Sequence, residues 1–151
     1  MVTKTVKSCE IIKAVIVNEN DSVIEVAKKL HEFQERRIIV VDKKKFPVGI
    51  ISVIDINDRV VARGKDLKKT KAKDIMSYPL NLVIDINEPI EDVAKKMVLR
   101  DNYYCPVIDK GVLKGLITYV KLMNCLKNGK IGIKNSSNVI FKNKGTKNAK
   151  R

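Results

Sequence analysis

The sequence predicts an α/β protein built from two copies of one β-α-β-β-α unit. The chain has 151 residues, a length that suits one compact globular domain. When the sequence is shifted by 67 positions, Val26–Lys29 falls on the identical Val93–Lys96. Further on, Gly49 aligns with Gly115 at an offset of 66. Each copy also alternates short apolar runs with segments of helical periodicity, so a tandem duplication is the simplest interpretation.

The first copy carries its elements in a clear order. An apolar strand is expected at Ala14–Val17. Ser22 is a good N-cap for a helix whose apolar residues recur at helical spacing over Val23–Leu30. The runs "RIIVVD" and "PVGIIS" predict two strands around a turn. A closing helix is expected over Val53–Ala62, and Gly64 is suited to end it.

The second copy repeats this order. A strand at Asn81–Asp85 leads to a helix over Pro89–Met97, and proline suits the start of a helix. The strands "YCPVID" and "LKGLIT" follow, and a last helix is expected over Tyr119–Leu126. The expected boundaries are residues 9–63 for the first unit, 64–73 for a lysine-rich linker, 74–128 for the second unit and 129–151 for a basic C-terminal tail.

The composition favours a soluble, globular, cytoplasmic protein. The chain is 44% hydrophobic and 32% charged, and no apolar run approaches the roughly 20 residues of a membrane-spanning helix. The first residues, "MVTKTVKSCE", lack the apolar stretch of a signal peptide. The three cysteines, Cys9, Cys105 and Cys125, are odd in number and widely spaced, so we expect reduced, buried thiols and neither a disulfide nor a zinc site.

Positive charge is concentrated at the C-terminal end. The formal net charge is +14, the last acidic residue is Asp109, and eight basic residues lie between Lys127 and Arg151. Such a tail can bind nucleic acid or another anionic surface without sequence specificity. A solvated terminus with no partner explains the same composition.

The stretch "GIISVIDI" holds the most informative polar pair, Ser52 and Asp55. A serine followed three residues later by an acid at a strand-to-helix junction forms a capping box, which needs no ligand. A carboxylate near helix amides also suits a ribose diol beside a phosphate. The matching positions of the second copy are Thr118 and Lys121. We find no catalytic or metal-binding motif and expect neither an enzyme nor a bound cofactor.

Taken together, these segments resemble a tandem pair of CBS domains, also called a Bateman module. The resemblance rests on "AKDIMSYP", "PIEDVAKKM", "YCPVIDKGVLKGLIT" and "GIISVIDI", and it spans about Cys9 to Leu126. It implies two CBS units packed by their sheets with pseudo-twofold symmetry, and commonly a homodimer. It also implies that clefts between the units bind an adenosyl ligand: AMP, ADP, ATP or S-adenosylmethionine.

The resemblance implies two unequal clefts. In the first, Asp55 would hold the ribose hydroxyls and Ser52 would approach a phosphate. Its remaining residues would be Ile75, Met76, Ser77, Tyr103 and Tyr104. The second cleft would join Thr118 and Lys121 to Arg36 and Arg37. A lysine cannot accept a hydrogen bond from a sugar hydroxyl, so this second cleft is expected either to take polyphosphate or to be a solvated basic edge.

Three functions remain open from the sequence. The first is a non-catalytic regulatory module that binds an adenine nucleotide or S-adenosylmethionine. The alternative is a nucleic-acid-associated protein that uses the basic tail. The third is a structural dimer whose clefts bind nothing.

Overall fold

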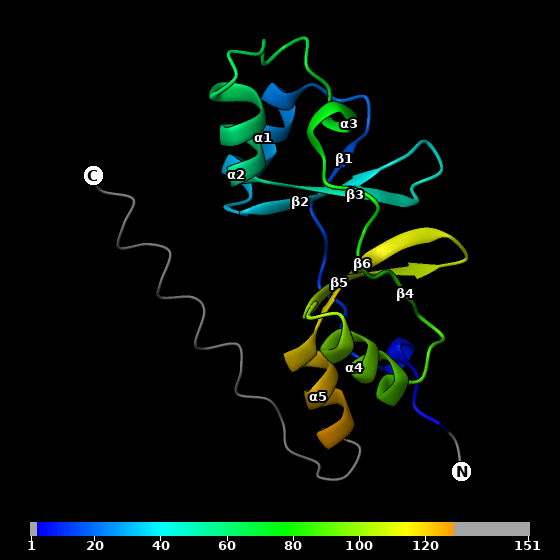
Figure 1. Ribbon diagram of the computed structural model, residues 1–151. Coiled ribbons are helices and arrows are strands. Elements are labelled where there is room, and N and C mark those ends of the chain that lie inside the picture. The colour runs from blue at the N-terminus through cyan, green and yellow to red at the C-terminus, as the bar shows by residue number, and fades with distance from the viewer. Residues whose placement is uncertain (1–2, 129–151) are drawn as a thin grey trace.

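Two three-stranded sheets lie face to face at the centre of the molecule, and helices cover the outer side of each sheet (Figure 1). The structure is a computed structural model that describes residues 3–128. The first unit contains β1 (Ile16–Asn18), α1 (Val23–Glu32), β2 (Arg37–Val41), β3 (Pro47–Ser52), α2 (Val53–Ile56) and a π-helical turn η2 (Asn57–Val61). The second contains β4 (Ile84–Asp85), α4 (Ile90–Leu99), β5 (Tyr104–Asp109), β6 (Val112–Thr118) and α5 (Tyr119–Asn128).

The two units have the same topology. In each, the first strand pairs in parallel with the second, and the second pairs antiparallel with the third. Parallel neighbours need a crossover, which α1 and α4 provide. The predicted α/β fold, a duplicated β-α-β-β-α unit packed by its sheets, is therefore confirmed.

Local sequence explains how α1 begins. The Ser22 hydroxyl accepts a hydrogen bond from the Glu25 amide, and the Glu25 carboxylate accepts one from the Ser22 amide, which completes a capping box. Val23, Val26 and Leu30 then form one buried stripe against the sheet. The apolar spacing of the sequence therefore predicted both the helix and its buried face.

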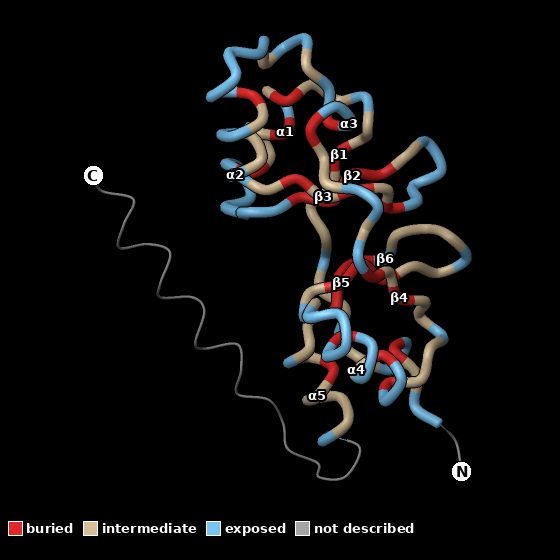
Figure 2. The backbone as a smooth tube through the Cα atoms, in the orientation of Figure 1, coloured by how far each residue is buried: buried red, intermediate tan, exposed pale blue. Residues whose placement is uncertain are grey.

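The buried residues form three clusters. Two of them lie one in each unit, between the sheet and the helices of that unit, where the buried segments of Figure 2 are concentrated. The third joins the two sheets across the middle of the molecule, with Ile39, Val41 and Leu116 at its centre. Tyr104 packs against this third cluster, so the site described below is next to the contact between the units.

The segments that precede the two units exchange places. We call residues 3–12 the N-terminal arm; it precedes the first unit but lies on the second. Within it, the 3-10 helix η1 (Val6–Ser8) places fully buried Val6 in the core of the second unit. Ile12 pairs with Leu116 of β6 through two backbone hydrogen bonds of 2.8 Å. Residues 9–12, which the sequence assigned to the first unit, thus belong spatially to the second.

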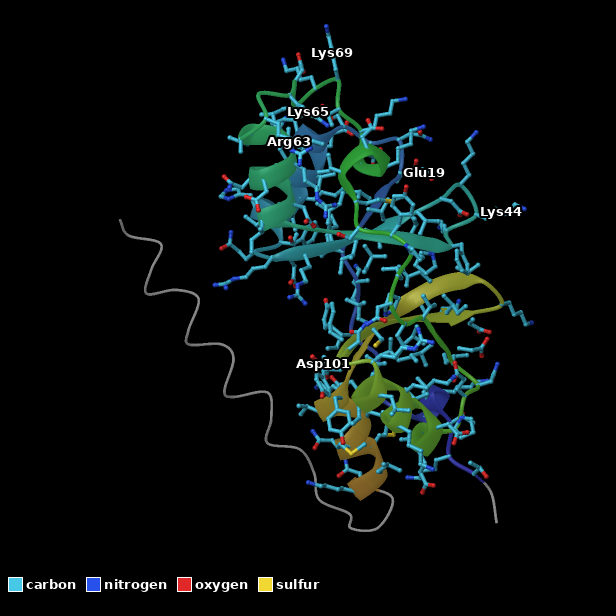
Figure 3. The ribbon with its side chains drawn as sticks, viewed as in Figure 1. Glu19, Lys44, Arg63, Lys65, Lys69 and Asp101 are labelled. Atoms are coloured by element: carbon cyan, nitrogen blue, oxygen red, sulfur yellow. A yellow bond between two sulfur atoms is a disulfide. The ribbon has the colours of Figure 1, made fainter. Side chains whose placement is uncertain are left out.

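The linker makes the reciprocal contact with the first unit. Its end forms the start of α3 (Ala72–Ile75), which runs past the expected boundary at residue 73 and whose buried residues join the core of the first unit. Ser77 then pairs with Ile50 of β3. Further out, Arg63, Lys65 and Lys69 lie at the end of the first unit remote from the sheets (Figure 3).

The repeated glycines make room for these two segments. A side-chain carbon added at Gly49 would meet the Met76 side chain, and one added at Gly115 would meet the Ile12 carbonyl. Both glycines occupy the third strand of their unit, next to the residue that pairs with the incoming segment. The two glycines therefore serve matching positions in different ways: Gly115 permits close approach of the Ile12 backbone, and Gly49 leaves room for the Met76 side chain.

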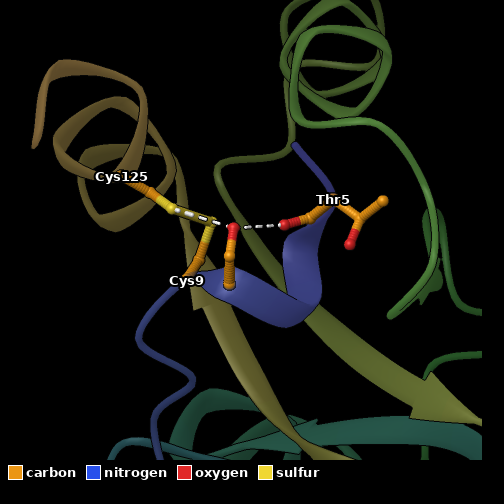
Figure 4. The surroundings of a disulfide bond; sticks show 4 residues. Thr5, Cys9 and Cys125 are labelled. Carbon is orange, nitrogen blue, oxygen red and sulfur yellow. Dashed lines mark hydrogen bonds between the residues drawn. A yellow bond between two sulfur atoms is a disulfide. The ribbon is translucent and has the colours of Figure 1, made fainter. Parts of the chain in front are cut away.

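The cysteines differ from the expectation. Cys9 and Cys125 form a disulfide between the N-terminal arm and α5, with their Cα atoms 5.3 Å apart (Figure 4). Cys105 is buried and unpaired, as expected. The prediction of a disulfide-free chain was wrong because the two residues are 116 positions apart and meet only through the exchange of segments.

Candidate functional site

A cavity of about 700 Å³ opens between the two units where β2, β3 and β5 carry polar residues. Six residues selected from the sequence line it: Arg36, Arg37, Ser52, Asp55, Ser77 and Tyr104. The other lining residues are Ile50, Val53, Ile54, Leu80, Asn81, Leu82, Asn102 and Pro106. Both units thus contribute to one space, and each supplies polar as well as apolar side chains to its wall.

Ser52 and Asp55 form a capping box at the start of α2. The Asp55 amide donates to the Ser52 hydroxyl at 3.1 Å, and the Ser52 amide donates to Asp55 Oδ2 at 2.8 Å. The capping interpretation of this pair is therefore confirmed. The same two side chains remain on the cavity wall, so capping does not withdraw them from the cleft.

Arg59 holds the second oxygen of the Asp55 carboxylate. Its Nη2 atom lies 3.7 Å from Asp55 Oδ1, one helical turn away, and the Asp55 side chain is 17% exposed. Arg59 Nη1 also donates a hydrogen bond of 2.7 Å to the Ile75 carbonyl oxygen. The carboxylate is therefore fixed in orientation by two neighbours on its own side of the cavity.

Arg36 and Arg37 line this cavity, which corrects the predicted grouping of these arginines with Thr118 and Lys121. The reason is strand register: Arg37 lies opposite Ser52 in the antiparallel β2–β3 pair. The Val53 amide donates to the Arg36 carbonyl oxygen at 3.1 Å, which extends that pairing by one step. Two exposed guanidinium groups thus share the cavity with the carboxylate of Asp55.

Tyr104 brings the second unit to the same cavity. Burial raises the pKa of its phenol, the nearby Glu35 carboxylate adds to the rise, and Arg37 opposes it. The phenol is consequently neutral and able to donate a hydrogen bond at physiological pH. Ser77 reaches the wall because its backbone pairs with Ile50 at 2.9 and 3.1 Å.

Three other predicted residues lie elsewhere. Ile75 and Met76 pack into the core of the first unit and do not line the cavity. Tyr103 also lies outside the cavity lining; its ring stacks edge-on against Tyr119 with centroids 5.6 Å apart.

Thr118 and Lys121 repeat one hydrogen bond of the cap, and neither lines the larger cavity. The Lys121 amide donates to the Thr118 hydroxyl at 3.2 Å, and Lys121 Nζ lies 2.7 Å from Glu10 Oε2. Lys121 lines a smaller hollow of about 170 Å³ beside the Cys9–Cys125 disulfide. The acid lost from the second motif is thus replaced by a lysine that binds the N-terminal arm.

Sequence reasoning missed several wall residues. Val53 and Ile54 follow the capping serine directly, and Ile54 is 68% exposed beside the cavity. Because they directly follow Ser52, the sequence could have predicted that Val53 and Ile54 line the same cavity. Asn81 and Asn102 gave no comparable signal, because only the packing of the two units brings them to the cleft.

Other kinds of site are not visible within residues 3–128. No group of three or more histidine, cysteine, aspartate or glutamate side chains in that range has the arrangement of a metal site. No helix there has the length and apolar character needed to cross a bilayer.

The CBS domain family matches the chain twice, over residues 6–62 and 72–128. "Uncharacterized protein MK0525" of Methanopyrus kandleri is 30% identical over 99 residues, which are 65% of this chain and 50% of that protein. The chain therefore spans only half the length of this relative.

Solved structures show the same fold. A CBS domain pair/ACT domain protein from Thermotoga maritima is 21% identical, with a TM-score of 0.65 over 85% of this chain and 100% of that one. The hexameric CBS-CP12 protein from bloom-forming cyanobacteria is 22% identical, with a TM-score of 0.61 over 88% of this chain and 78% of that one.

Proposed function

We propose that this chain, which belongs to the CBS domain family, is a non-catalytic regulatory module that binds an adenine nucleotide or S-adenosylmethionine between its two units. The observation that carries the proposal is that Asp55, Arg36, Arg37 and Tyr104 line one cavity. Its volume of about 700 Å³ lies within the range of roughly 300–1,000 Å³ typical of small-molecule sites.

The polar wall suits a ribose followed by phosphates. Each carboxylate oxygen has two acceptor positions, so Asp55 retains acceptor capacity beyond its bonds to Ser52 and Arg59. A vicinal diol can use that capacity. Arg36 and Arg37 provide planar, permanently charged groups for phosphate oxygens, which favours ATP and ADP over AMP.

The apolar wall suits an adenine ring. Ile50, Leu80, Leu82 and Pro106 supply aliphatic surface from both units, and the neutral Tyr104 phenol adds a hydrogen-bond donor. A flat heteroaromatic ring held there would contact both units at once. Binding would therefore favour the arrangement of the units that closes on the ligand, which is the basis of a regulatory response.

We further propose that the module works as a homodimer in the cytoplasm. Exposed apolar side chains lie on α2, η2 and α5: Ile54 is 68% exposed, Val61 59% and Val120 66%. A second copy would remove these surfaces from water, as apolar patches on a monomer often indicate. Size-exclusion chromatography with light scattering measures the oligomeric state.

Nucleic-acid binding by the basic tail is the alternative function. Residues 129–151 lie outside the described residues, so this alternative rests on their charge alone. Deleting residues 142–151 should then abolish salt-sensitive RNA binding and leave nucleotide binding unchanged.

Calorimetric titration of the full chain tests the proposed function. AMP, ADP, ATP and S-adenosylmethionine are titrated separately, and thermal melting is recorded with each ligand in excess. We expect saturable binding with ATP tighter than AMP, and a Tm that rises with ligand concentration. The absence of both heat and a Tm shift with all four ligands would reject the proposal.

A further inference from the structure

A second feature of the molecule lies outside the nucleotide cavity: the Cys9–Cys125 disulfide borders the smaller hollow of about 170 Å³. Lys4, Ser8 and Lys121 line the same hollow. Both cysteines are partly exposed, whereas the third thiol, Cys105, is fully buried. The two bonded cysteines are therefore closer to solvent than the remaining thiol and border a hollow that a small molecule can approach.

We propose that Cys9 and Cys125 form a reversible thiol–disulfide site for low-molecular-weight thiols, and that its redox state controls how firmly the N-terminal arm is held on the second unit. The position of the Cys9–Cys125 bond in the fold supports this proposal. Cys9 directly follows η1 in the arm, and Cys125 lies in α5, so the bond ties two segments that have no covalent connection nearby (Figure 4).

The chemistry is a two-step exchange. A thiolate attacks the Cys9 sulfur, the Cys9–Cys125 bond breaks, and Cys125 leaves as a thiolate while Cys9 forms a mixed disulfide. A second thiol then attacks that mixed disulfide and releases Cys9. The two cysteines are reduced, and two molecules of the small thiol are oxidised to one disulfide. The reverse reaction uses the oxidised small thiol.

Ser8 supports this direction of attack. Its Oγ atom lies 3.8 Å from Cys125 Sγ, within reach for a weak hydrogen bond to sulfur. In the disulfide form this hydroxyl donates a hydrogen bond of 2.8 Å to the Thr5 carbonyl oxygen. When it rotates away from that carbonyl, it can donate to the departing Cys125 thiolate, and a better leaving group is displaced faster. Cys9, by contrast, is the sulfur we expect to carry the mixed disulfide.

Reduction should loosen the arm without unfolding it. Non-covalent contacts remain: the Val6 amide donates to the Glu88 carbonyl at 3.0 Å, and the Lys7 amide donates to the Ile86 carbonyl at 2.8 Å. Val6 is also fully buried. The disulfide closes a loop over a separation of 116 residues, so opening it restores considerable freedom to the unfolded chain.

The arm also leads into the contact between the sheets. Ile12 pairs with β6, and the next residues include Ala14 and Ile16, which pack against the cluster that joins the two units. If the N-terminal arm detaches more often, the segment that leads from it into the contact between the sheets is held less firmly. The redox state would in this way affect the coupling of the units.

The test is a redox titration of the full chain with reduced and oxidised glutathione. Thiols are alkylated after acid quenching, and mass spectrometry assigns each cysteine. We expect the disulfide fraction to follow the glutathione ratio, the trapped adduct to lie on Cys9, and Cys105 to stay unmodified in the native protein. A disulfide that persists in excess reduced glutathione, or that never forms in excess oxidised glutathione, would overturn the proposal.

Stability and hydrogen exchange test the structural consequence. Reduction should lower the Tm by roughly 5–15 °C and speed amide exchange at Val6, Lys7 and Ile12. Cys125→Ser should show the reduced behaviour at every glutathione ratio, and Cys105→Ser should keep the parent's response. Equal Tm and equal exchange of the arm in both redox states of the parent protein would overturn control of the arm, whether or not the variants fold.

Discussion

The variant Asp55→Ala tests two roles of the Asp55 carboxylate: its observed role in capping α2 and its proposed role in binding a ribose. The substitution removes the acceptor of the 2.8 Å bond from the Ser52 amide, worth about 1 kcal/mol for a typical cap. It also removes the partner of Arg59 at 3.7 Å, a partly exposed ion pair worth about 1 kcal/mol or less. The expected loss of stability is therefore about 1–2 kcal/mol, or roughly 2–8 °C in Tm.

Asp55→Ala should also weaken nucleotide binding, and the loss of the helix cap does not account for that loss of affinity. Hydrogen bonds to a charged acceptor contribute about 1.5–3 kcal/mol, so Asp55→Ala should weaken ATP or AMP roughly 10- to 150-fold. Calorimetry gives the affinity and thermal melting gives the stability of the same preparation. A 2′-deoxynucleotide should bind the parent more weakly and lose little further affinity on the substitution.

Asp74→Ala is the matched control. Asp74 Oδ2 accepts a hydrogen bond of 2.9 Å from the Lys71 amide at the start of α3, so it performs the same capping role. Asp74 does not line the cavity. The control should lose comparable stability and keep full nucleotide affinity. If Asp55→Ala also binds as tightly as the parent, Asp55 is a cap only and the site assignment is wrong.

Three further predictions concern charge, packing and pH. Replacing Arg36 and Arg37 by alanine should weaken ATP at least about tenfold more than AMP in calorimetry; equal weakening would make both arginines solvated surface. Gly115→Ala should lower the midpoint of chemical denaturation, because the new side chain meets the Ile12 carbonyl; an unchanged midpoint would contradict the close approach. Burial raises the pKa of Cys105 from 9.0 to about 11, so the unfolded state loses its proton first. Stability should therefore fall between about pH 9 and 11, and Cys105→Ala should remove that part of the slope.

The repeat made the fold predictable from the sequence. Two aligned copies revealed the order of strands and helices, and local rules placed Ser22 and Ser52 at helix starts, where capping boxes are found. The resemblance to a known family then selected Asp55, Ser77 and Tyr104, which the structure brings to one cavity.

Long-range pairing could not be predicted in the same way. The exchange of segments depends on backbone hydrogen bonds, such as those of Ile12 with Leu116, and such bonds leave no pattern in side-chain order. The disulfide was missed for this reason. The arginines were misplaced for a related reason: counting back from the Val41–Pro47 pair would place Arg37 opposite Ile51, and the register shift between Val40 and Val41 moves it opposite Ser52.

A crystal structure of the full chain with ATP tests the central claim most directly. We predict that the ribose hydroxyls lie within hydrogen-bond distance of the Asp55 carboxylate, roughly 2.5–3.0 Å, with the phosphates against Arg36 and Arg37. The adenine should lie between the units near Tyr104. A nucleotide bound instead in the hollow beside Lys121, with the Asp55 cavity empty, would contradict the account.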